Sequence, residues 1–152
     1  MALVQEKLYK AADLASIDLG EYVRDISKEL AKFYQRGSQD IQLHVEANDI
    51  RLRIDLAIPC GLILSELISN AFKHAFAPNG AGHISIIIRK MENQHLEIVV
   101  SDNGSGLPME IDPFTTQSAG LYVVNGLVKN QLHGELTVHR GKGTEFRITV
   151  PV

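Results

Sequence analysis

The stretch Cys60-Gly-Leu-Ile-Leu-Ser-Glu-Leu-Ile-Ser-Asn-Ala-Phe-Lys-His-Ala-Phe76 has the apolar spacing of a helix with one buried face. A second face carries four polar side chains at the same spacing: Glu66, Asn70, Lys73 and His74. At about 100° per residue, these four fall within an arc of roughly 100°. Carboxylate and amide oxygens suit a hydrated Mg²⁺ and lysine suits phosphate, but an ordinary solvated helix face has the same spacing. This stretch alone therefore favours a solvated face.

A second stretch, Leu96-Glu-Ile-Val-Val-Ser-Asp102-Asn-Gly-Ser-Gly-Leu-Pro108, is typical of an apolar strand that ends in Asp-x-Gly-x-Gly. A carboxylate at a strand end can accept a hydrogen bond from an exocyclic amine, and the glycines beyond it let the backbone approach a planar ligand. Such a motif alone also forms plain turns. Two further glycine segments follow it in order, Ser118-Ala-Gly-Leu121 and Gly141-Lys-Gly-Thr-Glu-Phe146.

These four segments, in this order, resemble the ATP-binding domain that is shared by gyrase, the heat-shock chaperone ATPases, bacterial sensor histidine kinases and mismatch-repair ATPases. The resemblance covers about residues 40–152. It implies a Bergerat-type ATP-binding fold, with ATP and Mg²⁺ as ligands. With all four segments present, the functional interpretation of the polar helix face outweighs the solvated one.

The resemblance also implies roles for individual residues. The residue that matches Asn70 holds Mg²⁺ against the triphosphate, and the one that matches Glu66 polarises the attacking group or its water. Lys73 and His74 match positions that contact phosphate and ribose, and Asp102 matches the aspartate that accepts the adenine amine. The other expected ATP-binding residues are the glycines of the motifs and their neighbours: Gly104, Gly106, Leu107, Ser118, Gly120, Leu121, Gly143 and Thr144.

The segment before the last helix departs from the family pattern. The usual Gly-x-Gly-x-Gly is here Ser118-Ala-Gly-Leu-Tyr122, with one glycine of three. Seventeen residues separate Asp102 from Gly120, and they hold a single phenylalanine, Phe114. The resemblance therefore leaves open how this lid would hold the γ-phosphate. We expect residues 107–118 to be the most mobile segment of the nucleotide-free chain, because they lack apolar periodicity.

Bulk composition limits the class of protein. The chain has 152 residues, of which 45% are hydrophobic, enough for one core, and its net charge of −3 argues against a nucleic-acid binder. The single cysteine, Cys60, excludes a disulfide framework and fits a reducing compartment. We find no run of 18 apolar residues and no signal-peptide pattern, so we expect a cytoplasmic domain without membrane contact.

The residue pattern predicts an α+β fold, a two-layer sandwich in which helices cover one face of a mixed, mostly antiparallel sheet. Asp18 and Glu21 predict a capping box for a helix that runs to about Gln35 and ends at Gly37. Alternating hydrophobicity predicts strands at 41–46, 50–54, 83–90, 94–101, 135–139 and 144–150.

The pairing of these strands is also predicted. Residues 50–54 are expected to pair with 41–46 across a tight turn, and 83–90 with 94–101 as a hairpin. Asp55 is expected to cap the central helix. A further helix is expected over residues 119–132, closed by His133-Gly134.

Three features indicate a sensor histidine kinase among these ATPases. The chain is short, whereas the gyrase and chaperone types carry longer insertions. Residues 1–17, with Glu6-Lys-Leu-Tyr9, resemble the end of the dimerisation and phosphoacceptor region in one histidine-kinase subgroup, and Ala57-Ile-Pro-Cys-Gly-Leu-Ile63 resembles the same subgroup. We therefore expect residues 18–152 to be the catalytic and ATP-binding domain of a two-component sensor histidine kinase.

The expected partners are an upstream phosphoacceptor and dimerisation domain, through which the full-length protein would form a homodimer, and a response regulator. The γ-phosphoryl group of ATP would pass to a histidine of that upstream domain. None of the six histidines of this chain lies in an acceptor-like helix, so we expect it to bind ATP without labelling itself. Two alternatives stay open: an anti-sigma-factor-type serine kinase, and a nucleotide-binding module that signals without chemistry.

Overall fold

A computed structural model describes residues 16–35, 40–77, 80–105 and 119–152 of the chain. Its helices and strands are β1 (Ser16–Asp18), α2 (Leu19–Tyr34), β2 (Asp40–Glu46), β3 (Arg51–Arg53), α3 (Ile54–His74), β4 (Ala81–Met91), β5 (His95–Asp102), α4 (Ala119–Gly126), β6 (Glu135–Gly141) and β7 (Gly143–Pro151). A 3-10 turn, Glu92–Gln94, joins β4 to β5, and a π-helical stretch, Leu127–Gln131, continues α4.

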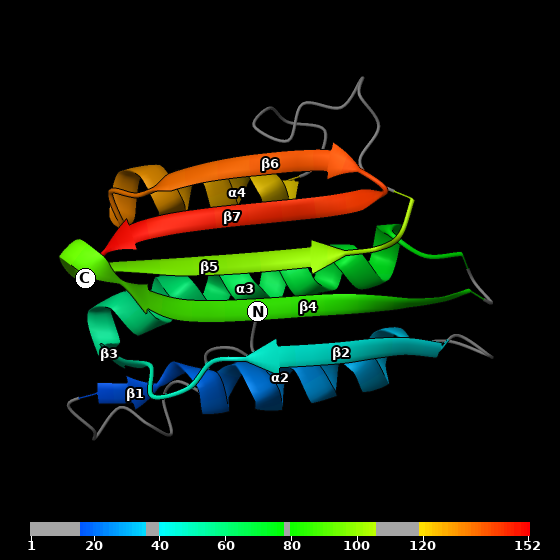
Figure 1. Cartoon of the computed structure of the whole chain (residues 1–152), viewed down its shortest axis with the longest axis horizontal. Helices are drawn as coiled ribbons and strands as arrows, with labels where there is room; N and C mark the ends of the chain where they lie inside the picture. Colours follow the sequence, from blue (N-terminus) through cyan, green and yellow to red (C-terminus); the bar gives the residue numbers. More distant parts are fainter. Residues whose placement is uncertain (1–15, 36–39, 78–79, 106–118) are drawn as a thin grey trace.

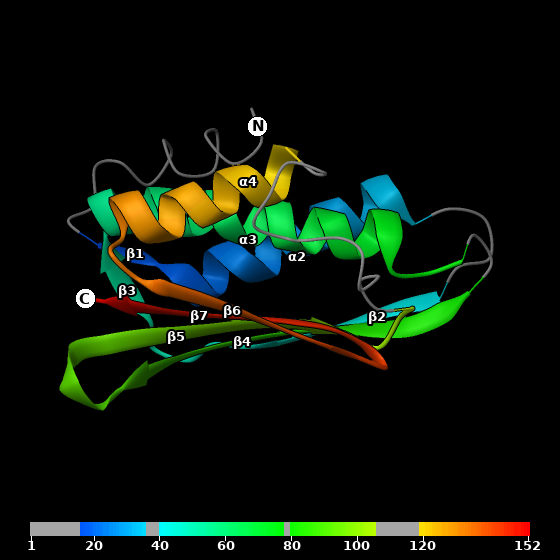
Figure 2. The same cartoon turned by 90° about the horizontal axis from the view of Figure 1, so that it is seen from above.

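The described residues form two layers. Five strands make one sheet in the order β2-β4-β5-β7-β6, and α2, α3 and α4 lie together on one of its faces (Figure 1, Figure 2). The β2–β4 pair is parallel, and the pairs β4–β5, β5–β7 and β6–β7 are antiparallel. The predicted α+β sandwich with a mixed, mostly antiparallel sheet is therefore confirmed.

Helix α2 begins as its sequence predicts. Asp18 is the N-cap residue, and its Oδ1 accepts a hydrogen bond of 3.1 Å from the backbone N–H of Glu21. The helix is followed by Gln35 in an extended conformation. The Gln35 side chain pairs with the backbone of Ile41, because its Oε1 accepts from Ile41 N at 3.1 Å and its Nε2 donates to Ile41 O at 3.4 Å. This amide pair joins the end of α2 to the start of β2, and the predicted cap at Gly37 lies outside the described residues.

The predicted pairing of residues 50–54 with 41–46 is wrong. Strand β3 pairs with β1 instead, in a separate two-stranded sheet, and β2 pairs with β4. Asp49 has a positive φ of 54°, and Ile50 O accepts a 2.8 Å hydrogen bond from Leu19 N at the start of α2. Alternating hydrophobicity predicts that a strand forms but not which edge it joins, since the partner depends on distant segments. Ser16 and Ile17 belong to β1, and the earlier part of the predicted 1–17 region lies outside the described residues.

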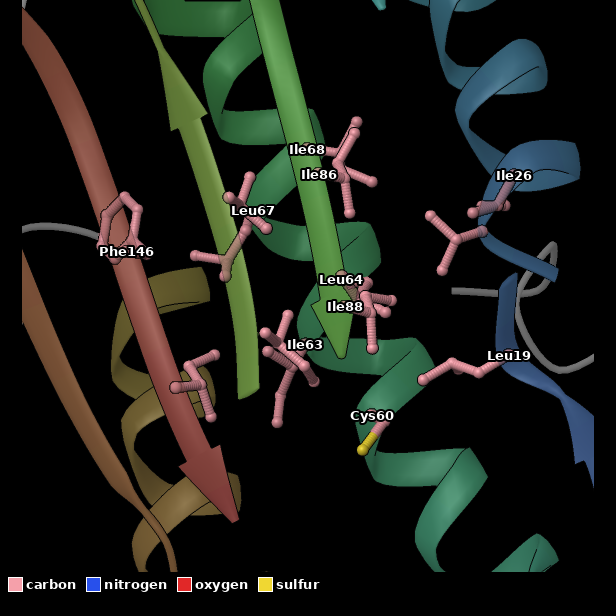
Figure 3. Packing of buried hydrophobic residues seen from close by; sticks show 14 of the residues in the cluster. Leu19, Ile26, Cys60, Ile63, Leu64, Leu67, Ile68, Ile86, Ile88 and Phe146 are labelled. Atoms are coloured by element: carbon pink, nitrogen blue, oxygen red, sulfur yellow. The ribbon is translucent and has the colours of Figure 1, made fainter. Parts of the chain in front are cut away.

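Helix α3 lies at the centre of the helical layer. Its inner face carries Ile63, Leu64, Leu67 and Ile68, each at most 1% exposed, over β4 and its neighbours (Figure 3). By length and composition α3 could span a membrane, but 61% of its most apolar window is buried inside the fold. Its apolar sequence is therefore explained by its central place in the core.

One of two predicted helix ends differs from the structure. The N-cap residue of α3 is Arg53 rather than Asp55, because the helix begins earlier and places Asp55 in its first turn. The predicted end of the last helix at His133-Gly134 is confirmed, since the π-helical stretch ends at Gln131 with Leu132 as its C-cap, and His133 has a positive φ of 56°. A Cβ on Gly134 would overlap Thr149 O of β7. Helix ends are decided by such contacts as much as by local sequence.

Candidate functional site

Asp102 lies where the sheet ends beneath the helical layer. It is the last residue of β5 and pairs with Thr144 of β7, which is 8% exposed. Gly143 has a φ of 131°, and a Cβ on it would overlap Asp102 O, so this position requires glycine. The predicted residues Asp102, Gly143 and Thr144 are thus brought together by strand pairing.

The carboxylate of Asp102 is incompletely satisfied. Burial raises its pKa above the ordinary value, and hydrogen bonds from the backbone of Gly104 and Thr144 offset only part of this rise. The bond from Gly104 N to Asp102 Oδ1 is 3.0 Å long. Among the described residues this half-buried carboxylate meets two backbone donors, so it retains capacity to accept a hydrogen bond from a ligand.

The loop after β5 is pressed against the end of α3. Ser105 N donates to Ala75 O at 2.9 Å, and a Cβ on Gly104 would overlap the same carbonyl. Gly104 is therefore required by close packing against Ala75, the residue that follows α3 and lies five positions after Asn70. This contact connects the strand that carries Asp102 with the helix that carries Glu66 and Asn70.

Glu66 and Asn70 meet the start of α4. A Cβ placed on Gly120 would overlap Glu66 Oε2, and would lie 3.3 Å from Glu66 Cδ and 3.8 Å from Asn70 Nδ2. Any larger residue at position 120 would displace the Glu66 carboxylate. The amide nitrogen of Asn70 is buried and has no hydrogen-bond partner among the described residues. Such an unpaired buried donor is uncommon in proteins and is consistent with a site for a ligand.

The other two members of the polar face are arranged differently. The Lys73 ammonium lies 5.4 Å from the centroid of the Tyr34 ring of α2, a cation–π contact. Tyr34 in turn stacks on Phe72, with a centroid distance of 6.4 Å. Lys73 and His74 are both exposed, and His74 is the last residue of α3. Lys73 would have to leave Tyr34 to contact a phosphate bound beside Asn70.

The remaining predicted residues fall into two groups. The side chain of Leu121 is buried in the core at 6% exposure, so any contact with a nucleotide would come from its backbone. The structure does not describe Gly106, Leu107 and Ser118, nor the lid segment 107–118 that we expect to be mobile.

Sequence reasoning missed a group of residues that joins α3 to the sheet. His83 N donates to Asn103 Oδ1 at 2.7 Å, and Asn103 N donates to His83 O at 3.2 Å. A Cβ on Gly82 would overlap the Phe76 ring and lie 2.9 Å from Asn103 Oδ1. A signal was available, because Asn103 lies between Asp102 and Gly104 and Phe76 ends the helix stretch.

Comparison with known proteins gives a family match over most of this region. The sequence model described as histidine kinase-, DNA gyrase B-, and HSP90-like ATPase matches residues 56–152. Blue-light-activated histidine kinase 2 of Erythrobacter litoralis is 30% identical over 95% of the chain and 44% of that protein. Sensor histidine kinase PdtaS of Mycobacterium tuberculosis is 35% identical over 64% of the chain and 20% of that protein.

A solved structure shares the fold. The histidine kinase domain of a blue-light-activated histidine kinase from Erythrobacter litoralis superimposes with a TM-score of 0.80 and 28% identity. It covers 95% of this chain and 69% of that one. The chain thus spans less than half the length of the two sequence relatives named above.

Proposed function

The chain belongs to the histidine kinase-, DNA gyrase B- and HSP90-like ATPase family as the catalytic, ATP-binding domain of a histidine kinase, and from this premise we propose that it transfers the γ-phosphoryl group of ATP to a histidine of an upstream helical domain. The observation that carries the proposal is the meeting of Glu66, Asn70 and Gly120, with Asp102 at the adjoining strand end. In this proposal each group would contact a different part of the reacting complex.

Asp102 would select the base. Its Oδ1 accepts from Gly104 N, and the raised pKa reflects a carboxylate that is partly removed from water. An adenine amine would supply a further donor, whereas guanine has a carbonyl oxygen at the equivalent place. Gly104 and Gly143 let the backbone pack closely on either side of Asp102, since Ala75 O and Asp102 O respectively come where their Cβ atoms would be. We therefore propose ATP rather than GTP as the substrate.

Asn70 would act on the phosphates and the metal. Its amide oxygen suits Mg²⁺, and its unpaired amide nitrogen would donate to a phosphate oxygen. In the described part of the chain, no cluster of three His, Cys, Asp or Glu side chains could hold a metal, so phosphate oxygens would complete the coordination. Mg²⁺, when bound, would neutralise charge on the phosphoryl oxygens. The first turn of α4, beside Gly120, would offer backbone N–H groups to the same anion.

Glu66 would act on the attacking imidazole. Its carboxylate lies between Asn70 and Gly120, so it is within the same region as the proposed phosphate contacts. There it would orient or deprotonate the imidazole N–H as the nitrogen attacks the γ-phosphorus in line. Lys73 would move from Tyr34 to offset charge on the phosphate, and His74 would contact the ribose.

The wider assignment concerns the whole protein. We propose that the acceptor histidine belongs to an upstream dimerisation domain, that the full-length protein is a homodimer, and that a response regulator receives the phosphoryl group. We also propose that this domain works in the cytoplasm without contacting nucleic acid or membrane. These partners are consistent with the sensor histidine kinases named above.

The test is phosphotransfer from labelled ATP in the full-length protein, with the product analysed for acid lability. An acid-labile phosphohistidine is expected, and Asn70→Ala should reduce its formation by at least about 100-fold and remove the Mg²⁺ dependence of nucleotide binding. Glu66→Gln should reduce transfer while leaving ATP affinity within about twofold. An acid-stable phosphoserine, or normal transfer by Asn70→Ala, would contradict the proposal. The isolated 152-residue chain should bind ATP without labelling itself.

A further inference from the structure

The backbone turns away from the sheet one residue beyond Asp102, and the side chain of Asn103 fixes the position of this turn. In the β4–β5 ladder the last paired residues are Ile84 and Asp102. The next pair would be His83 and Asn103, and these two do exchange two hydrogen bonds. In an antiparallel ladder both bonds would be between backbone groups. Here the Asn103 side-chain oxygen replaces the backbone carbonyl as the acceptor from His83 N, so the backbone after Asn103 is free to turn.

The turn that follows carries the loop onto α3. Gly104 packs against Ala75 O and donates its N–H to Asp102 Oδ1, and Ser105 N donates to Ala75 O. The orientation of the Asp102 carboxylate therefore depends on where Gly104 lies. That place depends in turn on Asn103, which immediately precedes Gly104 and is held to β4.

Gly82 of β4 brings Asn103 and the end of α3 to the same place. A Cβ on Gly82 would overlap the Phe76 ring and would lie 2.9 Å from Asn103 Oδ1. Thus the segment that ends α3 meets the start of β4 through Phe76 and meets the loop after β5 through Ala75. Asn103 bonds to β4 at His83, the residue next to Gly82.

We infer that Asn103 is a positioning residue for nucleotide recognition. It holds the turn after β5 in place. The Asp102 carboxylate on the sheet and Asn70 on α3 then keep a fixed distance and orientation relative to each other and can contact one nucleotide. The inference rests on the proposed adenine contact of Asp102. Asn103 need not touch the nucleotide, since its side-chain oxygen accepts from His83 N.

The experiment compares ATP with purine riboside triphosphate, which lacks the 6-amino group, by calorimetry on the 152-residue chain. The ratio of the two dissociation constants measures the amine contact, and general effects on triphosphate binding cancel in it. The wild type should prefer ATP by about 10-fold or more, as expected for a hydrogen bond to a charged group. Asn103→Ala should reduce this ratio to about threefold or less, whereas Asn103→Asp, which keeps an acceptor oxygen for His83 N, should retain most of it.

Gln35→Ala is the matched control. The Gln35 amide also pairs with backbone at a strand end, through Ile41, but at the start of β2, outside the proposed site. It should lower the melting temperature about as much as Asn103→Ala and leave the nucleotide ratio unchanged. If Asn103→Ala does not fold, Asn103→Ser replaces it, because its shorter side chain cannot span the same 2.7 Å bond without moving the turn.

Failure of the inference can be distinguished from failure of the proposed function. If Asn103→Ala or Asn103→Ser keeps the ratio of dissociation constants seen in the wild type, the inference is overturned while ATP binding stays intact. A ratio lost equally in Gln35→Ala also overturns it, because the effect would then follow stability alone. A wild-type chain that binds neither nucleotide overturns the proposed function itself.

Discussion

Glu97 and Asp102 are carboxylates on the same strand, β5, but they differ in burial and in hydrogen-bond partners. Glu97 is 5% exposed on the sheet face away from the helices, and both its oxygens are bonded, to Arg89 Nε and Arg147 Nη1 at 2.9 Å each. Asp102 lies at the strand end and receives hydrogen bonds from backbone groups alone in the described residues. One carboxylate is paired with two guanidinium groups of the protein, whereas the other meets neutral backbone donors and no cation among the described residues.

The two environments move the two pKa values in opposite directions. Burial raises the pKa of Glu97, but the hydrogen bonds and charges of Arg89 and Arg147 outweigh it and hold the pKa below its ordinary value. Burial also raises the pKa of Asp102, and the two backbone bonds do not outweigh it. Polar groups that stabilise a fold are satisfied within it, while those of a binding site are left partly unsatisfied for the ligand. The Asn70 amide nitrogen, which has no hydrogen-bond partner in the described part of the chain, belongs to the second class.

The largest expected effect separates the two carboxylates by ligand affinity. Asp102→Asn should weaken ATP binding by about 100-fold, because a charged acceptor is replaced by a neutral amide, and it should also narrow the preference for ATP over GTP. Glu97→Gln should change ATP affinity by less than about twofold, since Glu97 is paired with two arginines away from the proposed site. Calorimetry with both nucleotides measures this. Equal ATP and GTP affinity in the wild type would contradict the assignment of Asp102.

The second prediction concerns stability, in which Glu97→Gln should have the larger effect and Asp102→Asn the smaller. Glu97→Gln should lower the free energy of unfolding by about 2 kcal/mol at neutral pH, because it weakens two charge-assisted bonds to a buried carboxylate, although Arg147 keeps its 3.4 Å contact with Glu145. Asp102→Asn should not lower it. Urea denaturation of both variants is the measurement, and a Glu97→Gln protein as stable as the wild type would remove the contrast.

A smaller effect is expected at the start of α4. Gly120→Ala should weaken ATP binding by about fivefold to tenfold, because the new Cβ would displace the Glu66 carboxylate and lie 3.8 Å from the Asn70 amide nitrogen that is proposed to bind phosphate. Adenosine, which lacks phosphates, should bind as before. Gly126→Ala is the control on the same helix, since a Cβ there meets nothing within 4 Å. That change should be neutral to ATP and slightly stabilising, by about 0.5–1 kcal/mol. Equal effects of both variants on ATP affinity would refute the Gly120–Glu66 contact.

The smallest effect concerns pH. The folded-state pKa of Glu97 is lowered, so its contribution to stability is present above the unfolded pKa of about 4.3 and is lost as pH falls through the folded value. The stability difference between wild type and Glu97→Gln should therefore close below about pH 4.3.

Asp102 should show the opposite sign. Its folded pKa is raised, so the favourable contribution is present below the unfolded pKa of about 3.9 and is lost as pH rises through the folded value. Asp102→Asn should thus be slightly more stable than the wild type at pH 7, and this advantage should vanish in acid. Parallel pH profiles for the two variants would contradict the opposite shifts.

Local sequence predicted most elements because their signals are short-range. Asp18 caps α2 as its spacing with Glu21 predicts, and residues 81–91 and 95–102 form the predicted hairpin. The predictions that failed needed distant partners. Residues 51–53 join β1 rather than β2, and Asp55 lies within α3 because that helix begins directly after β3.

The sequence by itself determined which side chains could serve a nucleotide. Helical spacing places Glu66 and Asn70 on one face of α3, and strand patterning places Asp102 at a strand end before two glycines. Both conclusions follow from periods of 3.6 and 2 residues, which the chain carries locally.

Only the tertiary structure decided how these groups meet. Gly120 comes against Glu66 across fifty-four residues of chain, Lys73 lies over Tyr34 rather than along the polar face, and Asn103 bonds back to His83. No local period encodes these contacts, because each depends on how two elements far apart in sequence are packed. Packing against the core sets the distance and angle between α3, α4 and β5, and that relation turns separate polar residues into one site.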